Sequence, residues 1–328
     1  MSELRFDGQV AIVTGAGGGL GAAHAKLLAA RGARVVVNDY GGSTQGTGSS
    51  KMPADDVVAE IRAQGGEAVA SYDSVIDAAA GLAIVRRAVD TFGRVDIVVS
   101  NAGISGGGRF GEMPSESVER MVDTHLIGAF NVVQPAWQRM IAQGYGRVVL
   151  TTSGSVFGTA TASYVSAKAG VFGLARALSS EGRAHDIKVN AIMPVAYSRM
   201  TAQIPDEPFR TWLEQNFPPH KVSPLVALLA HNEAPCSGET FSVGGGRVAR
   251  VVLGVGPGWA TPDPSPEAFL QNFDACMSID PLVLPKSGEQ EVHTAPTHAL
   301  ASIAAIGWGW GGAWPDSHDY QHFSASGR

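Results

Sequence analysis

A tyrosine and a lysine four residues apart carry the clearest chemical signal in the sequence. Tyr164 and Lys168 follow a short loop, and their spacing places them on one face of a helix. A cation beside a phenol favours the phenolate and lowers a pKa that is ordinarily about 10. We therefore expect Tyr164 to act as a general acid–base group near neutral pH, with Lys168 tuning it.

A hydroxyl group shortly before Tyr164 would complete this chemistry by orienting a substrate oxygen. Ser153 stands at the end of the strand expected at residues 146–152, and Ser155 follows two residues later. We take Ser153 as the candidate and Ser155 as the alternative.

A glycine-rich turn near the N-terminus predicts a dinucleotide site. A buried apolar strand over residues 10–14 leads into Gly15, Gly17, Gly18, Gly19 and Gly21, and a helix is expected over residues 22–31. Strand, glycine turn and helix is the context that such a site requires. The glycines let the backbone approach a pyrophosphate, and the helix N-terminus offers free N–H groups.

Two carboxylates follow the next two expected strands. Asp39 ends the strand at 34–39, 18 residues after Gly21, where a carboxylate accepts hydrogen bonds from the adenosine ribose. Its charge repels a 2′-phosphate, so NAD is favoured over NADP. Asp73 follows the strand at 68–71 and is placed either to receive the adenine amino group or to form a turn.

Strands and helices alternate along the chain. Further strands are expected at 95–99, 187–192 and 240–243, and helices at 53–64, 78–92, 115–142 and 162–181. This order predicts an α/β fold, a Rossmann-like doubly wound parallel sheet of seven strands with helices on both faces. Ligands in such sheets bind beyond the strand C-termini, where the sequence places Gly15, Asp39, Asn101, Ser153 and Pro194.

Composition narrows the functional class. The chain has 328 residues, 45% of them apolar, and a net charge of −6 without a basic stripe, which argues against nucleic acid as a partner. Its two cysteines lie far apart and are expected to be reduced. No signal-peptide core or membrane span is apparent, so we expect a cytoplasmic protein that acts on a small molecule.

The sequence predicts one catalytic domain, residues 1–248, and an irregular C-terminal extension, residues 249–328. We expect the extension to be a cap or an oligomer contact and not an independent domain. The extension contains histidines at positions 293, 298, 318 and 322, but their spacing matches no metal template, so no metal site is expected.

Taken together, these motifs resemble the short-chain dehydrogenase/reductase family over roughly residues 5–245. The family's glycine motif matches Thr14-Gly15-x-x-x-Gly19-x-Gly21, its second motif matches Asn101-Ala102-Gly103, and its catalytic pair matches Tyr164-x-x-x-Lys168. Within the family, residues 37–42, 72–75 and 197–201 resemble the (3R)-hydroxyacyl-CoA dehydrogenases of the peroxisomal multifunctional enzymes.

The resemblance implies hydride transfer between a secondary alcohol and NAD, with a 3-hydroxyacyl-CoA type of substrate. A free alcohol such as a steroid or terpenoid is the alternative, and a non-catalytic NAD-binding protein is a remote one. A homodimer or homotetramer through the two long helices is also implied. The implied cofactor-binding residues are Gly15, Gly18, Gly19, Leu20, Asp39, Asp73, Ser74, Asn101, Ala102, Gly103, Tyr164, Lys168, Pro194 and Thr201.

Four positions depart from the family pattern, and two of these, Ser100 before Asn101 and Val195 after Pro194, replace the usual Asn and Gly. The family's serine usually lies 13 residues before the tyrosine, which is Thr151 here, whereas counting six residues from Arg147 gives Ser153. We follow the count from Arg147, because the sheet fixes that end and loops absorb deletions. The family's asparagine that anchors a proton-relay water is His125 here, so the resemblance gives His125 a catalytic role. A buried packing role is the alternative.

Overall fold

The computed structural model describes residues 3–285, 309–310 and 323–324. The chain divides into two compact units, residues 1–251 and residues 252–328. The expected boundary at 248 falls within the last strand of the first unit, three residues before that unit ends.

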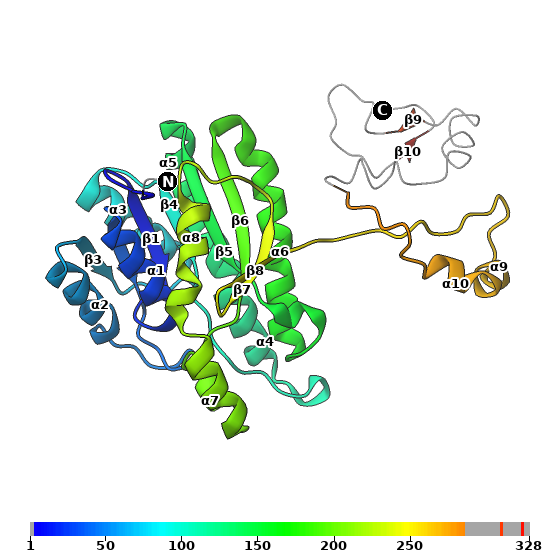
Figure 1. Ribbon diagram of the computed structural model, residues 1–328, viewed down its shortest axis with the longest axis horizontal. Helices are drawn as coiled ribbons and strands as arrows, with labels where there is room; N and C mark the ends of the chain where they lie inside the picture. Colours follow the sequence, from blue (N-terminus) through cyan, green and yellow to red (C-terminus); the bar gives the residue numbers. More distant parts are fainter. Residues whose placement is uncertain (1–2, 286–308, 311–322, 325–328) are drawn as a thin grey trace. The chain divides into compact units, whose positions relative to one another are not determined.

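The first unit is built on a parallel sheet of seven strands with an added eighth (Figure 1). The strand order is β3-β2-β1-β4-β5-β6-β7-β8, in which β1 to β7 run parallel. The expectation of a doubly wound α/β fold is confirmed. The parallel strands are β1 (Val10–Thr14), β2 (Arg34–Asn38), β3 (Glu67–Ser71), β4 (Ile97–Ser100), β5 (Gly146–Thr151), β6 (Ile187–Pro194) and β7 (Thr240–Gly244).

The eighth strand corrects the expectation of seven. β8 (Arg247–Val251) pairs antiparallel with β7. Gly245 and Gly246 join the two strands with φ angles of 58° and 88°. Two consecutive residues with positive φ make the tight turn whose twist suits a hairpin, and glycine adopts it without strain.

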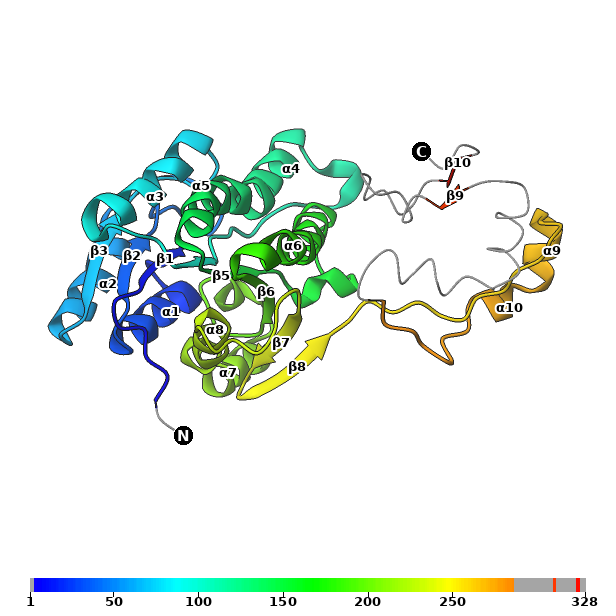
Figure 2. The same ribbon diagram turned by 90° about the horizontal axis from the view of Figure 1, so that it is seen from above.

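Helices cover both faces of the sheet, as the alternation of elements predicts (Figure 2). On one face, α1, α2 and α8 bury apolar side chains against the sheet, and on the other α3, α5 and α6 do so. The sheet is therefore buried on both sides, which explains its nearly continuous apolar strands. The helices are α1 (Gly19–Ala30), α2 (Met52–Ala63), α3 (Ala78–Phe92), α4 (Ser115–Val122), α5 (Gly128–Gln143), α6 (Ala162–Glu181), α7 (Glu207–Asn216) and α8 (Ser223–Ala230).

The long helix expected at 115–142 is not regular. Between α4 and α5 the backbone makes a π-helical turn, η2, over Asp123–Ile127. Such turns insert one residue into a helix and often occur at functional sites. Here the turn carries His125, which is 4% exposed.

In the second unit, two short helices, α9 (Pro266–Gln271) and α10 (Phe273–Cys276), precede a two-residue antiparallel pair. That pair joins β9 (Gly309–Trp310) to β10 (Phe323–Ser324). The histidines of the extension lie outside the described residues. Among the residues that the structure describes, no cluster of side chains could hold a metal ion, and Cys236 and Cys276 form no disulfide. Among the helices that the structure describes, none has the length and apolarity to cross a membrane.

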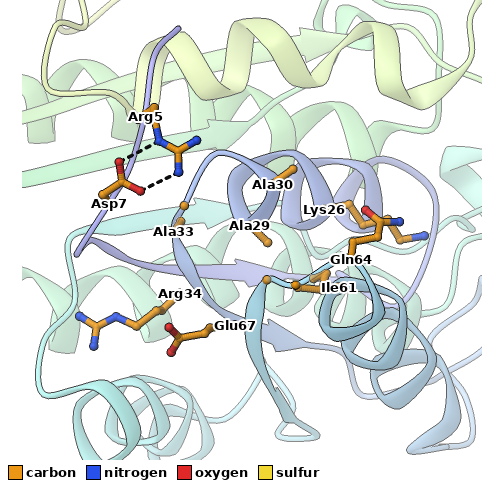
Figure 3. A pocket seen from close by; sticks show the side chains of 13 residues that line it. Arg5, Asp7, Lys26, Ala29, Ala30, Ala33, Arg34, Ile61, Gln64 and Glu67 are labelled. Carbon is orange, nitrogen blue, oxygen red and sulfur yellow. Dashed lines mark hydrogen bonds and ion pairs between the residues drawn. The ribbon is translucent and has the colours of Figure 1, made fainter.

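A pocket of about 290 Å³ opens at the N-terminal ends of β2 and β3 (Figure 3). Of the charged side chains that line it, Arg5 pairs with Asp7, and Lys26 pairs with Glu60, which lies outside the lining. This edge is opposite to the strand C-termini, where ligands of such sheets bind. The candidate site therefore lies elsewhere.

Candidate active site

The glycine turn after β1 leaves an opening at the C-terminal edge of the sheet. Two of its glycines are needed for packing, because a Cβ on Gly15 would lie 2.8 Å from Ala102 Cα and one on Gly21 would lie 2.2 Å from Gly15 O. A Cβ on Gly18 would meet nothing within 4 Å. Gly18 is also the N-cap of α1 and offers no side-chain cap. The exposed N-terminus of α1, with Gly19 and Leu20 in its first turn, therefore fits a pyrophosphate.

Asp39 is fixed beside this turn. Its Oδ2 accepts a hydrogen bond of 2.7 Å from Gly17 N, and its Oδ1 accepts one of 2.7 Å from Gly41 N. The carboxylate is 8% exposed. Each oxygen keeps a further lone pair, so the carboxylate is oriented and still able to accept from ribose hydroxyls.

Asp73 and Ser74 lie at the end of β3. Asp73 Oδ2 accepts from Ser71 Oγ at 3.0 Å, and its carbonyl accepts from Asn38 Nδ2 at 2.9 Å. Ser74 Oγ accepts from Ile76 N at 3.4 Å. Asp73 thus also takes part in local turn contacts, the alternative that the sequence left open, while its half-exposed carboxylate lies at the expected edge.

Asn101 and Ala102 are tied to the end of β1. Asn101 Nδ2 donates to Thr14 O at 3.0 Å and to Gly15 O at 3.2 Å. Thr14 Oγ1 accepts from the backbone N–H groups of Asn101 and Ala102 at 3.0 and 3.1 Å. Sequence reasoning gave Thr14 no role of its own, although a hydroxyl directly before the glycine turn is a recognisable signal. These bonds hold the glycine turn against β4.

Gly103 makes room for His125. A Cβ on Gly103 would lie 2.6 Å from His125 Cε1. The imidazole Nε2 lies 2.9 Å from Ile104 O and 3.2 Å from Ile104 N, and the Nδ1 atom is buried without a partner. Burial, with the nearby Lys168 charge, lowers the pKa of His125 well below 6.5, so the ring is neutral. Nε2 either donates to Ile104 O or accepts from Ile104 N, and Nδ1 is then an acceptor in the first tautomer and a donor in the second.

Ser153 is the hydroxyl that the structure brings to Tyr164. Burial raises the pKa of Tyr164, and the nearby Ser153 hydroxyl lowers it by a smaller amount. Ser155 Oγ accepts from Ser153 Oγ at 3.1 Å. Among the described residues the buried Thr151 hydroxyl has no hydrogen-bond partner. Of the two hydroxyls that the counts give, Ser153 is the one near Tyr164, and its catalytic role stays a prediction.

Lys168 corrects one expectation about Tyr164. Its Nζ lies 5.8 Å from the Tyr164 ring centroid and donates to Thr151 O at 2.6 Å. Burial lowers the pKa of Lys168 to about 7. In the chain alone the pKa of Tyr164 is raised and not lowered, because burial removes water from the phenol. Lys168 is only partly charged at neutral pH, so its lowering effect on the tyrosine pKa is too weak to reverse this shift. His125 completes the group, with its ring 5.0 Å from that of Tyr164.

Pro194 ends β6 and leads into a segment that contains Thr201. Thr201 Oγ1 accepts from Ser198 N at 2.6 Å, which caps a short turn. The Ser198 side chain in turn approaches the glycine turn, since a Cβ on Gly19 would lie 3.9 Å from Ser198 Cβ. The segment after β6 therefore borders the same opening as the glycine turn.

Comparisons with known proteins agree with this geometry. The short chain dehydrogenase family model matches residues 9–207. A second model, D-alanyl-D-alanine carboxypeptidase, matches the short stretch 267–325, most of which lies outside the described residues.

Three similar proteins cover the first unit. Peroxisomal multifunctional enzyme type 2 of Mus musculus is 46% identical over 252 residues, 76% of this chain but 33% of that enzyme. A short-chain type dehydrogenase/reductase of Mycobacterium tuberculosis is 45% identical over 248 residues, 75% of this chain and 85% of the relative. Carveol dehydrogenase from Mycobacterium avium, solved in complex with NAD, has a TM-score of 0.66 at 27% identity and covers 73% of this chain and 97% of that one.

The resemblance drawn from the sequence motifs is thereby confirmed. Because the family model matches more than half of the chain and the mycobacterial relative is matched over most of its length, the chain belongs to the short-chain dehydrogenase family.

Proposed function

We propose that the protein is an NAD-dependent dehydrogenase that oxidises a secondary alcohol of the 3-hydroxyacyl-CoA type, or reduces the matching ketone. One observation carries the proposal. At the sheet edge that holds the glycine turn and Asp39, Tyr164 lies close enough to Ser153 for that hydroxyl to affect its pKa, and the buried Lys168 Nζ lies 5.8 Å from the tyrosine ring centroid. These are the groups that a reversible proton transfer at an alcohol oxygen requires.

Each side chain of the site has a separate role in proton transfer or in orienting the substrate. Tyr164 Oη takes the alcohol proton while the carbinol carbon loses a hydride, and it returns that proton in the reverse direction. Ser153 Oγ donates to the substrate oxygen and holds it beside Tyr164. When bound, NAD would supply the hydride acceptor and a positive charge. Lys168 Nζ, held by Thr151 O, would bind the nicotinamide ribose and exchange a proton with Tyr164, accepting it after oxidation of the alcohol and returning it after reduction of the ketone. Neutral His125 keeps Nδ1 in the same buried region.

We infer NAD and not NADP as the cofactor, because the two backbone bonds to Asp39 hold its carboxylate in place beside the glycine turn. Replacing Asp39 with Asn keeps the size and one acceptor oxygen but removes the charge. We expect Asp39→Asn to lower kcat/KM for NAD about tenfold and to raise it for NADP. Rates with both cofactors give the ratio, and a wild-type preference for NADP would contradict this assignment.

The proposal of an acyl-CoA substrate is based on two observations. The chain is similar to the mouse enzyme, whose name places it among the peroxisomal multifunctional enzymes, and it shares sequence motifs with that group. The likeness to carveol dehydrogenase supports the second candidate, a free alcohol. A panel assay that follows NADH absorbance with 3-hydroxyacyl-CoA thioesters and free secondary alcohols separates the two. Turnover of free alcohols alone would reject the thioester, and any NAD-dependent turnover excludes a non-catalytic role.

Assembly and location are proposals as well. The family resemblance supports a homodimer or homotetramer, which sedimentation velocity would measure directly. Two free cysteines support a reducing compartment such as the cytoplasm. We also propose that residues 249–328 serve as a cap or oligomer contact, which deletion of that segment tests through the sedimentation coefficient and KM.

A further inference from the structure

The loop between β2 and α2 crosses the edge of the sheet where the cofactor is proposed to bind. We call residues 40–51 the strap. Thr44 O, in the strap, accepts from Ser105 N at 2.7 Å and from Ser105 Oγ at 3.2 Å. Ser105 follows β4, and β1 lies between β2 and β4 in the sheet. The strap therefore passes the C-terminal end of β1, which is where the glycine turn begins.

The tip of the strap is closed by its own hydrogen bonds and packs on Ile104, which follows β4. Bonds from Ser43 N to Thr47 O and from Gly46 N to Ser43 O close the tip at 2.8 and 2.9 Å. Gly46 packs on Ile104, since a Cβ there would lie 3.1 Å from Ile104 Cγ2.

Thr44 also joins the strap to the segment after β6. Its Oγ1 accepts from Gln203 Nε2 at 2.8 Å. Gln203 ends the short 3₁₀ turn η5 (Thr201–Gln203), and we call residues 195–206 the lid segment. One threonine therefore connects three chain segments that are far apart in sequence.

The strap and the lid segment begin on opposite sides of the opening at the glycine turn. On one side, a Cβ on Gly17 would lie 2.6 Å from Pro53 Cβ and 2.8 Å from Asp39 Cγ, at the two ends of the strap. On the other side, Ser198 of the lid segment approaches Gly19. Among the glycines of this turn, only Gly18 has no described atom within 4 Å of an added Cβ. The opening is thus flanked on both sides by segments that meet through Thr44 and Gln203.

We propose that the strap and the lid segment form a closed ring around the pyrophosphate of the bound dinucleotide, and that Thr44 and Gln203 are the positioning residues that open it. This inference rests on the proposed function. Two bonds, one of them from the backbone, hold Thr44 to Ser105, whereas a single neutral side-chain bond on an exposed glutamine closes the ring. The ring opens at this weaker bond. Cofactor release is therefore coupled to movement of the lid segment.

The test measures NADH release from the full-length protein by rapid mixing with excess unlabelled NAD, using the fluorescence of bound NADH. Thr44→Val keeps the shape of the side chain but removes its acceptor, and Gln203→Leu removes the donor. Each is expected to speed NADH release about three- to tenfold, the range for loss of one hydrogen bond. The double variant is expected to release NADH no faster than the single ones, because both break the same bond.

Thr44→Ser is the matched control, because it retains the hydroxyl and is expected to release NADH within twofold of wild type. Unchanged urea midpoints in all variants separate ring opening from loss of stability. Release within twofold of wild type in both single variants overturns the ring, and so does a double variant whose effects multiply. A wild-type protein that binds no NADH overturns the proposed function together with the ring, so the two failures are distinguishable.

Discussion

Tyr164 illustrates how a side chain's chemistry depends on its burial. The four-residue spacing to Lys168 predicts a lowered pKa, yet desolvation raises it in the protein alone. Tyr164 can therefore ionise and act as a base near neutral pH only when further positive charge lies nearby. In the proposed mechanism, the oxidised nicotinamide supplies that charge. A neutral resting Tyr164 also avoids a buried, uncompensated negative charge.

The first residue-scale prediction concerns Tyr164. Tyr164→Phe removes the proton donor and acceptor but keeps the ring that packs against His125. We expect kcat to fall at least 10²-fold, the usual contribution of a general acid–base group, with NADH affinity within about threefold of wild type. Steady-state rates and NADH fluorescence titration measure the two quantities. Unchanged turnover would remove Tyr164 from the mechanism.

The second residue-scale prediction separates three hydroxyls. Ser153→Ala should lower kcat by about 10²-fold, because Ser153 is the hydroxyl close enough to Tyr164 to affect its pKa and is proposed to hold the substrate oxygen. Thr151→Val should leave kcat within threefold, since the Thr151 hydroxyl is buried without a partner. Ser155→Ala tests the alternative serine. A larger loss of kcat in Ser155→Ala than in Ser153→Ala would reverse the assignment.

At the scale of elements, the glycine turn depends on a joint between β1 and β4. Thr14→Val removes the oxygen that accepts from Asn101 N and Ala102 N and leaves both N–H groups unpaired. We expect the free energy of unfolding to drop by about 1–3 kcal/mol and NADH to bind more weakly. Thr14→Ser keeps the acceptor and is the matched control. Urea denaturation of both variants measures the difference, and equal stability of the two would show that the joint contributes nothing.

Two elements could not be predicted from the spacing of apolar residues in the sequence, namely β8 and the π turn. β8 is half exposed and short, so its apolar pattern is weak, although the three glycines before it mark a hairpin. The π turn at Asp123–Ile127 has no local signature at all. It is maintained by packing of His125 against Gly103, which lies 22 residues earlier in the chain.

At the scale of the whole molecule, two buried histidines make stability depend on pH. His24 joins α1 to α8 through a 2.8 Å contact between its Nδ1 and Ser223 Oγ, and burial lowers its pKa to about 3. Its folded pKa is depressed, so the unfolded chain takes up a proton first as the pH falls below 6.5. The stabilisation is present above that pH and is lost progressively toward pH 3.

We expect the free energy of unfolding to fall by about 1 kcal/mol per pH unit between pH 6 and 5 from His24 alone, with His125 acting in the same direction. Urea denaturation across this range measures the slope. His24→Asn keeps a polar group near Ser223 but cannot titrate, so its slope should be shallower by that amount. Identical slopes would place the acid sensitivity elsewhere.

The fold class and the seven parallel strands could be predicted from the sequence, which also offered the candidate residues of the site. This was possible because glycine turns, strand-end carboxylates and the tyrosine–lysine spacing are local signals. Only the tertiary structure decided which hydroxyl meets Tyr164, that Thr14 and Asn101 brace the glycine turn, and that Thr44 reaches the lid segment. It also decided the direction of the tyrosine pKa shift. These outcomes depend on burial and on contacts between distant segments, which no local pattern records.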